Sequence, residues 1–366
     1  MIATLCLAAI LLAQEPGPVD ALLSRHQDAI RRAKTFDELT AVAKNTLAEL
    51  AKLLDTKLDP ESAARARAIS CDICADLGDF DAAEAHARKF LDSWPKHPKA
   101  PLMKMTLGEV RTAGGRDAAA RSAYQALIQE HPNDEFVFDA RLRIAQSFTC
   151  EGRDDEALKA LAEIRASSKG KPEEWMAVMQ MSLAHQIAGK PGDGRALLEE
   201  VVRSCPNAPI VEVAKRILVN WLWIGKTAPP AEGKNLKDEA VRLDPAGGKV
   251  TVLYFLGTAY PKFAIEAGVM RRLAGRFAPA DFALLGVALD KEKSKLEPDL
   301  ALAGVTWPVL FDGDGFKGPV ASTFRVDDLP MVFVLDRKNV IRYVNPIFGD
   351  HGREIGRCVE RLIAGK

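Results

Sequence analysis

A 37-residue repeat constrains the fold of this chain more than any other feature of its sequence. Glycines recur four times at this spacing, and each is followed five residues later by a small residue. In three of the four repeats a proline follows the glycine by seventeen residues. The positions are Gly78, Ala83 and Pro95, then Gly115, Ala120 and Pro132, then Gly152, Ala157 and Lys169, and finally Gly189, Gly194 and Pro206. Four evenly spaced units predict a solenoid, in which each repeat packs against its neighbours.

Each repeat is predicted to be a hairpin of two helices. Residues 60–223 are rich in Ala, Leu, Glu, Arg and Lys, and apolar positions recur at three- and four-residue steps, which favours amphipathic helices. The glycine would end the first helix, the small residue would let the helices approach closely, and the proline would end the second helix. Two further helices, at residues 19–33 and 36–54, are expected to cap the first repeat.

The spacing of these residues resembles that of tetratricopeptide (TPR) repeats, whose usual period is about 34 residues. The longer period here predicts longer turns between repeats, and the resemblance implies a helical TPR-like domain over residues 18–223. Such a solenoid performs no chemistry itself and normally holds a protein or peptide partner, or another domain of its own chain. The alternative is that the solenoid is a spacer or a dimerisation unit. In the second case the protein would be a homo-oligomer.

The last third of the chain has the pattern of a mixed sheet covered by helices. Continuous apolar runs at 249–256 and 282–289 predict buried parallel strands. Two later runs, at 331–336 and 340–345, predict a hairpin. Helical periodicity lies between and after these strands, at residues 262–277, 294–303 and 350–364. This order places helices on both sides of the sheet.

Residues 224–366 resemble the thioredoxin-like (redoxin) domains of the TlpA/ResA type, which bacterial cell envelopes contain. The order of elements carries this resemblance, together with the segment Gly225-Lys226-Thr227-Ala228-Pro229-Pro230, which is similar to the opening of redoxin domains. The predicted fold class is therefore an α+β two-domain chain. An all-α TPR-like helical solenoid is followed by an α/β thioredoxin-like fold.

The resemblance implies a W-C-x-x-C motif after the first long strand, and this chain lacks it. The turn reads Phe-Leu-Gly-Thr-Ala-Tyr-Pro-Lys-Phe at 255–263, so Tyr260 and Phe263 stand at the two cysteine positions, with Pro261 and Lys262 between them. A peroxiredoxin-type cysteine would fall on Pro261. None of these side chains forms a thiolate, which dithiol–disulfide exchange requires. We therefore predict a degenerate site with no catalytic residue.

One element of the family's site is retained, because Leu329-Pro330 occupies the place of its cis-proline. We predict that Tyr260, Phe263, Leu329 and Pro330 form an apolar surface that binds a peptide, although Pro330 alone could serve only the chain geometry. The predicted function is a non-catalytic cell-envelope protein in which both domains bind proteins or peptides. The alternative is a thiol-disulfide oxidoreductase that uses a displaced cysteine.

The cysteines elsewhere suggest neither a redox motif nor a metal site. Cys71 and Cys74 form a C-x-x-C sequence, but it lies inside a predicted helix, where core packing is the expected role. A zinc site would need two further ligands, and the sequence places none near these cysteines. Cys358, in the closing helix, is the sole cysteine of residues 224–366. We expect no metal and no cofactor.

Composition and the amino terminus bear on partners and location. Lys plus Arg and Asp plus Glu each number 50, and this balance argues against a nucleic-acid partner, which normally requires a basic excess. Residues 1–13 are apolar and resemble a secretory signal cleaved near Ala13, with an uncleaved amino-terminal anchor as the alternative. We expect an exported mature chain without an integral membrane span.

The link between the predicted domains is short, which restricts their relative motion. Trp221 and Trp223 end the helical part only a few residues before the sheet domain begins. We predict that at least one of these tryptophans packs against the thioredoxin-like domain.

Overall fold

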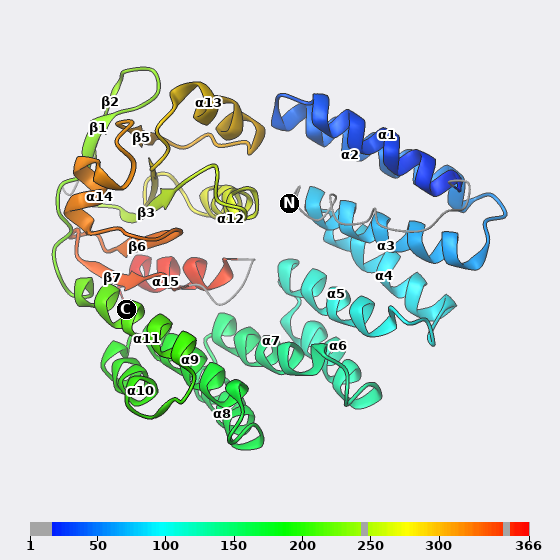
Figure 1. Cartoon of the computed structure of the whole chain (residues 1–366), viewed down its shortest axis with the longest axis horizontal. Coiled ribbons are helices and arrows are strands. Elements are labelled where there is room, and N and C mark those ends of the chain that lie inside the picture. The colour runs from blue at the N-terminus through cyan, green and yellow to red at the C-terminus, as the bar shows by residue number, and fades with distance from the viewer. Residues whose placement is uncertain (1–16, 243–247, 347–351, 366) are drawn as a thin grey trace. The chain divides into compact units, whose positions relative to one another are not determined.

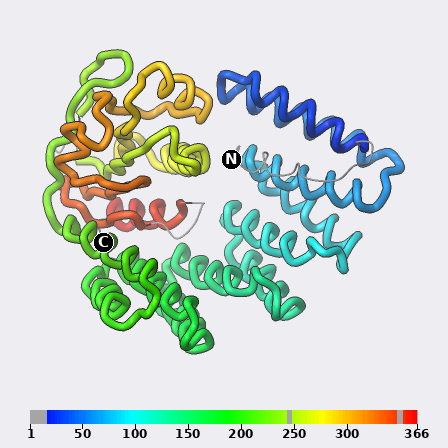
Figure 2. The backbone as a smooth tube through the Cα atoms, in the orientation of Figure 1, coloured from blue at the N-terminus to red at the C-terminus, as the bar shows by residue number. Residues whose placement is uncertain are grey.

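The computed structural model describes residues 17–242, 248–346 and 352–365 (Figures 1 and 2). The predicted signal segment, residues 1–13, lies outside these described residues. The chain divides into two compact units, residues 1–147 and 148–366. The second unit contains the later helices of the repeat together with the sheet.

Helices fill residues 18–220, as the sequence predicts. Their bounds are α1 Pro18–Arg32, α2 Phe36–Leu54, α3 Pro60–Leu77, α4 Phe80–Ser93, α5 Ala100–Ala113, α6 Asp117–Glu130, α7 Phe136–Glu151, α8 Asp154–Ser167, α9 Pro172–Ile187, α10 Pro191–Ser204 and α11 Ala208–Asn220. The first two match the predicted capping helices within one residue at each end.

The repeat residues have the structural roles that their types suggest. The four glycines connect the two helices of each hairpin with φ between 75° and 81°, a left-handed conformation that favours glycine. The small residues five positions later are fully buried where the paired helices meet. The second helix of each hairpin ends two residues before the proline position of its repeat, whether that residue is proline or Lys169.

The remaining elements build a five-stranded mixed sheet and a separate two-stranded one. Their bounds are η2 Trp221–Trp223, β1 Glu232–Lys234, β2 Ala240–Arg242, β3 Val250–Leu256, α12 Phe263–Arg276, β4 Phe282–Ala288, α13 Lys293–Leu302, β5 Val309–Phe311, η4 Gly315–Lys317, α14 Pro319–Phe324, β6 Met331–Leu335, β7 Ile341–Val344 and α15 Arg353–Ile363. The large sheet has the order β5-β4-β3-β6-β7, in which β3 pairs parallel to β4 and antiparallel to β6.

Both faces of the central strand β3 are covered, and all seven of its residues are buried. Val250, Val252 and Tyr254 face the core formed with α12, α13 and α15. Leu253 and Phe255 face a second core, which α14 and the last helices of the repeat share. Alternate residues of one strand thus belong to two cores, as expected for a strand buried on both faces.

The short elements β1, β2, β5 and α14 were not expected from the sequence. Each of these strands has only three residues, too few to show a two-residue alternation. The four longer predicted strands and the three predicted helices are all present, with ends shifted by at most a few residues.

The edge strand β7 is covered by a linker segment and by one glutamine of α9. The backbone of residues 225–228 pairs with the first part of β7, where Gly225 N donates to Ile341 O at 2.8 Å and Ile341 N donates to Lys226 O at 2.9 Å. At Val344 the side chain of Gln186 replaces a neighbouring strand: its Oε1 accepts from Val344 N at 2.8 Å and its Nε2 donates to Val344 O at 3.1 Å. Both residues are fully buried.

Two arginines of α15 contact the ends of helices in the repeat. Arg357 donates to Thr149 O and forms an ion pair with Asp154 at 2.7 Å. Arg361 donates to Ala188 O at 3.1 Å, beside the C-terminus of α9. Each guanidinium thus lies where unsatisfied carbonyls and the helix dipole favour positive charge.

The tryptophans at the end of the repeat pack against the sheet domain, which confirms the prediction for this junction. Trp221 is 2% exposed and belongs to the core that includes Phe255 and Phe333. The ring centroid of Trp223 lies 5.8 Å from that of Phe324 and 6.4 Å from that of Phe333. The contact between the last repeat helices and the sheet is therefore fixed by aromatic packing.

Candidate functional site

The turn after β3 is held by hydrogen bonds to the end of β4. Thr258 donates to Asp290 twice, from its backbone N at 3.1 Å and from Oγ1 at 2.7 Å. Tyr260 N donates to Gly257 O at 3.0 Å, and Phe263 N donates to Tyr260 O at 2.9 Å, so α12 begins directly behind the turn. The backbone of residues 257–263 thus forms a hydrogen-bonded turn that leads directly into α12.

The loop before β6 faces this turn. The Leu329–Pro330 peptide bond is cis, as the sequence predicted. A Cβ atom on Gly257 would stand 2.8 Å from Leu329 Cδ1, which shows how closely loop and turn approach. Asn345 fixes the loop, since its Oδ1 accepts from Val332 N at 2.6 Å and its Nδ2 donates to Pro330 O at 3.3 Å.

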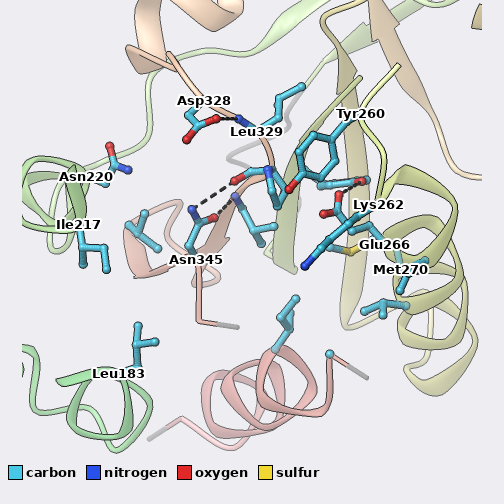
Figure 3. A pocket seen from close by; sticks show the side chains of 18 of the residues that line it. Leu183, Ile217, Asn220, Tyr260, Lys262, Glu266, Met270, Asp328, Leu329 and Asn345 are labelled. Atoms are coloured by element: carbon cyan, nitrogen blue, oxygen red, sulfur yellow. Dashed lines mark hydrogen bonds between the residues drawn. The ribbon is translucent and has the colours of Figure 1, made fainter. Parts of the chain in front are cut away.

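A cavity of about 410 Å³ opens between this turn, the cis-proline loop and the last repeat helices (Figure 3). One side is formed by the turn and the start of α12, with Tyr260 and Lys262, and another by the loop, with Leu329 and Pro330. The remaining lining residues are Leu183, Ile217, Asn220, Trp221, Tyr254, Ile265, Glu266, Val269, Met270, Asp328, Val332, Val344, Asn345, Gly352 and Ile355. Two thirds of the lining is apolar or aromatic by residue type, which suits a ligand pocket.

A hydrogen-bonded tyrosine–glutamate pair lies at the cavity wall. Tyr254 Oη donates to Glu266 Oε2 at 2.9 Å. Burial, followed by the charge of Glu266, raises the pKa of Tyr254 well above its usual value, so the phenol stays protonated and keeps donating. Glu266 follows Phe263 by three residues on α12, and neither it nor Tyr254 was among the predicted site residues.

The structure brings together three of the four residues predicted for the apolar surface. Tyr260, Leu329 and Pro330 all line the cavity. Phe263 is 5% exposed and packs in the core with Val252 and Met270 instead. Pro261 is exposed and not among the lining residues, whereas Lys262 lines the cavity.

The cavity wall formed by the repeat was not foreseen residue by residue. Leu183 lies on α9, and Ile217 and Asn220 lie on α11. Of the lining residues from this part of the chain, only Trp221 was predicted to lie at the junction. Nothing in the helical periodicity separates the other positions from ordinary packing residues. They become part of a site only because the last helices pack on the sheet domain.

No cysteine lines the cavity, and none of the five cysteines in the described residues forms a disulfide. Cys358 is fully buried in α15, and burial raises its pKa. Within the same ranges, no three His, Cys, Asp or Glu side chains are grouped to hold a metal ion. Among the helices described, none is long and apolar enough to cross a membrane.

Cys71 and Cys74 lie inside α3 and are buried, in agreement with their predicted core role. Burial is the main reason why the pKa of Cys71 is raised and that of Cys74 rises to about 11. At pH 8 a thiol with such a pKa is ionised to only about one part in a thousand.

We expect the double variant Cys71→Ala/Cys74→Ala to react with Ellman's reagent as fast as the unchanged native protein does. The half-buried Cys150 and Cys205 should account for the fast phase in both proteins. Stopped-flow absorbance at about 412 nm, the usual wavelength for this reagent, measures this rate. The control is Cys205→Ala, which should remove part of the fast amplitude. A fast phase that disappears in the double variant would show that the C-x-x-C thiols are accessible.

The comparisons with known proteins agree with this architecture. Residues 224–344 match the AhpC/TSA family, and residues 75–135 match the tetratricopeptide repeat. No curated protein matches the chain.

The solved structures that are similar to the sheet domain are named as thiol-disulfide oxidoreductases or interchange proteins. A thiol-disulfide oxidoreductase from Bacteroides fragilis is 21% identical, with a TM-score of 0.34, and the match covers 37% of this chain and 100% of that one. The thioredoxin domain of a thiol-disulfide oxidoreductase from Bacteroides vulgatus is 20% identical, with a TM-score of 0.34 and coverage of 37% and 97%. A thiol:disulfide interchange protein from Chlorobium tepidum is 18% identical, with a TM-score of 0.31 and coverage of 38% and 97%.

The family matches fall on the two parts that the repeat and the sheet define. Residues 224–344 are a redoxin domain of the AhpC/TSA family with a thioredoxin-like fold, and tetratricopeptide repeats precede it in the chain.

Proposed function

We propose that this chain is a non-catalytic, exported binding protein, in which the repeats and a redox-inactive thioredoxin-like domain bind a protein or peptide partner. The observation that carries the proposal is the chemistry of the turn. Tyr260 and Phe263 occupy the positions of the family's thiols, and the sole cysteine of residues 224–366, Cys358, is fully buried. A thiol exchange reaction needs an accessible thiolate at this place.

The displaced-cysteine alternative receives no support from the cavity. Its lining contains aromatic, aliphatic, amide and charged side chains but no sulfur nucleophile. Met270 is the lining residue with sulfur, and a thioether does not exchange with disulfides. The proposal therefore keeps the family's surface for peptides and gives up its redox step.

Binding is favoured by what surrounds the old site. The cavity lies beside the cis-proline loop, and helices α9 and α11 add apolar residues to it. Tetratricopeptide repeats generally bind proteins or peptides, so two binding surfaces occur in one chain. The predicted domain boundary at 223/224 and the signal at 1–13 remain predictions within this proposal.

The full-length protein is expected to leave the rate of insulin reduction by dithiothreitol unchanged. Turbidity at increasing protein concentrations measures this rate, with a thioredoxin as the positive control. Because no thiolate is available at the turn, the curve should coincide with the reaction without protein. A concentration-dependent acceleration that is lost in Cys358→Ala would establish the displaced-cysteine enzyme instead.

A further inference from the structure

We propose that the cavity binds an apolar carboxylate, namely the C-terminal carboxylate of a peptide together with its last apolar side chain. This inference rests on the proposed binding function and specifies its ligand. The observations that carry it are the state of the charged groups in the lining, the position of the hydrogen-bond donors, and the size and polarity of the walls.

Three charged side chains line the cavity, and two of them are already engaged. Both oxygens of Asp328 have partners: Oδ2 pairs with Arg216 at 2.7 Å, and Oδ1 accepts from Leu329 N at 2.9 Å. Glu266 accepts the hydrogen bond of Tyr254. Lys262 forms no ion pair with any other residue that the structure describes. Because the Tyr254 phenol is neutral, Glu266 keeps its negative charge. Lys262 is therefore the group in the lining that attracts a carboxylate, and the charge of the ligand must lie beside it.

Lys262 and Tyr260 enter the cavity from the same side, opposite Leu183 and Ile217 (Figure 3). A carboxylate placed there can accept from the Lys262 ammonium and from the Tyr260 hydroxyl. Lys262 is also the N-cap residue of the 14-residue helix α12 and gives it no side-chain cap. The first turn of this helix adds a favourable field for negative charge.

The opposite walls are apolar and require an apolar body on the same ligand. Leu183 and Ile217 come from the repeat, Leu329 comes from the cis-proline loop, and Met270 comes from α12. The volume of about 410 Å³ lies near the lower end of the range of about 300–1,000 Å³ that small ligands occupy. It suits the last one or two residues of a chain.

The test compares two fluorescein-labelled peptides, each ending in Gly-Ser-Gly-Ala-Phe, one with a free carboxylate and one with a C-terminal amide. Fluorescence anisotropy with the full-length protein gives both dissociation constants. We expect the free acid to bind about tenfold tighter or more, because a charge-assisted hydrogen bond is lost in the amide. Sodium decanoate is titrated as a competitor to represent a free apolar acid.

Two variants locate the effect. Lys262→Met should abolish the preference for the acid by weakening acid binding about tenfold, and Lys262→Arg should keep the preference. Lys338→Met, a change of the same chemistry at an exposed residue between β6 and β7, is the matched control and should behave like the unchanged protein.

The outcomes separate this inference from the proposed function. Equal affinity for acid and amide in the unchanged protein overturns carboxylate recognition and leaves peptide binding standing. Lys262-dependent binding of decanoate without binding of either peptide overturns the peptide as source and identifies a free acid. Absence of binding by all three probes overturns the inference and the peptide-binding role of this cavity together.

Discussion

Replacing Gln186 with Leu is expected to lower the free energy of unfolding of the 148–366 unit by about 2–4 kcal/mol, since each buried polar group left without a partner costs about 1–3 kcal/mol. The substitution removes both side-chain hydrogen bonds to Val344 while keeping a similar volume. Water cannot replace them, because both residues are fully buried. Urea denaturation followed by tryptophan fluorescence measures the loss, since Trp221 and Trp223 lie at the same junction.

The matched control is Gln125→Leu, the same chemical change at an exposed position of α6. Its effect should stay within about 0.5 kcal/mol, as for most surface substitutions. If Gln186→Leu were as mild as this control, the backbone of Val344 would have to find other partners, and the role given to Gln186 would be wrong.

Replacing Gly194 with Ala is expected to destabilise the protein, although it restores the residue that the other three repeats carry. A Cβ atom at this position would lie 2.5 Å from Ser182 O and 3.0 Å from the ring of Trp221. Overpacking of this kind costs about 1–3 kcal/mol, more than the gain of about 1 kcal/mol from replacing a helical glycine. Because Ser182 O belongs to the backbone of α9, the two helices themselves must separate.

Gly192→Ala provides the control in the same helix, since a Cβ atom there meets no other atom within 4 Å. This variant should be neutral or more stable by up to about 1 kcal/mol. Differential scanning calorimetry of both variants measures the difference. Equal melting temperatures for the two would mean that the helices relax without cost and that Trp221 is free to move.

The repeat and the long strands were predictable because their signals are periodic. Gly78 and its three equivalents fix the hairpins through a backbone conformation that few other residues adopt. The strand β3 is recognisable from seven consecutive apolar or small polar residues. The three-residue strands carry no such periodicity, and their pairing depends on contacts with segments distant in sequence.

The candidate site was predictable only on the side of the family motif. Tyr260, Lys262, Leu329 and Pro330 could be placed because the thioredoxin-like order of elements fixes where turn and loop meet. Leu183 and Ile217 could not, since their part in the cavity depends on how α9 and α11 pack on the sheet. Phe263 could be aligned with the second cysteine of the motif, but its place could not be predicted, because its side chain packs in the core.

The glutamine that closes the edge of β7 also bears on how this protein can be divided. The family match begins at residue 224, but a fragment cut there would lack Gln186 and both tryptophans of the junction. Its sheet would then present the free amide and carbonyl of Val344 at an open edge, and unpaired edges promote association between chains. The redoxin domain of this protein is therefore expected to aggregate when expressed alone, and its solubility depends on a helix that belongs to the repeat.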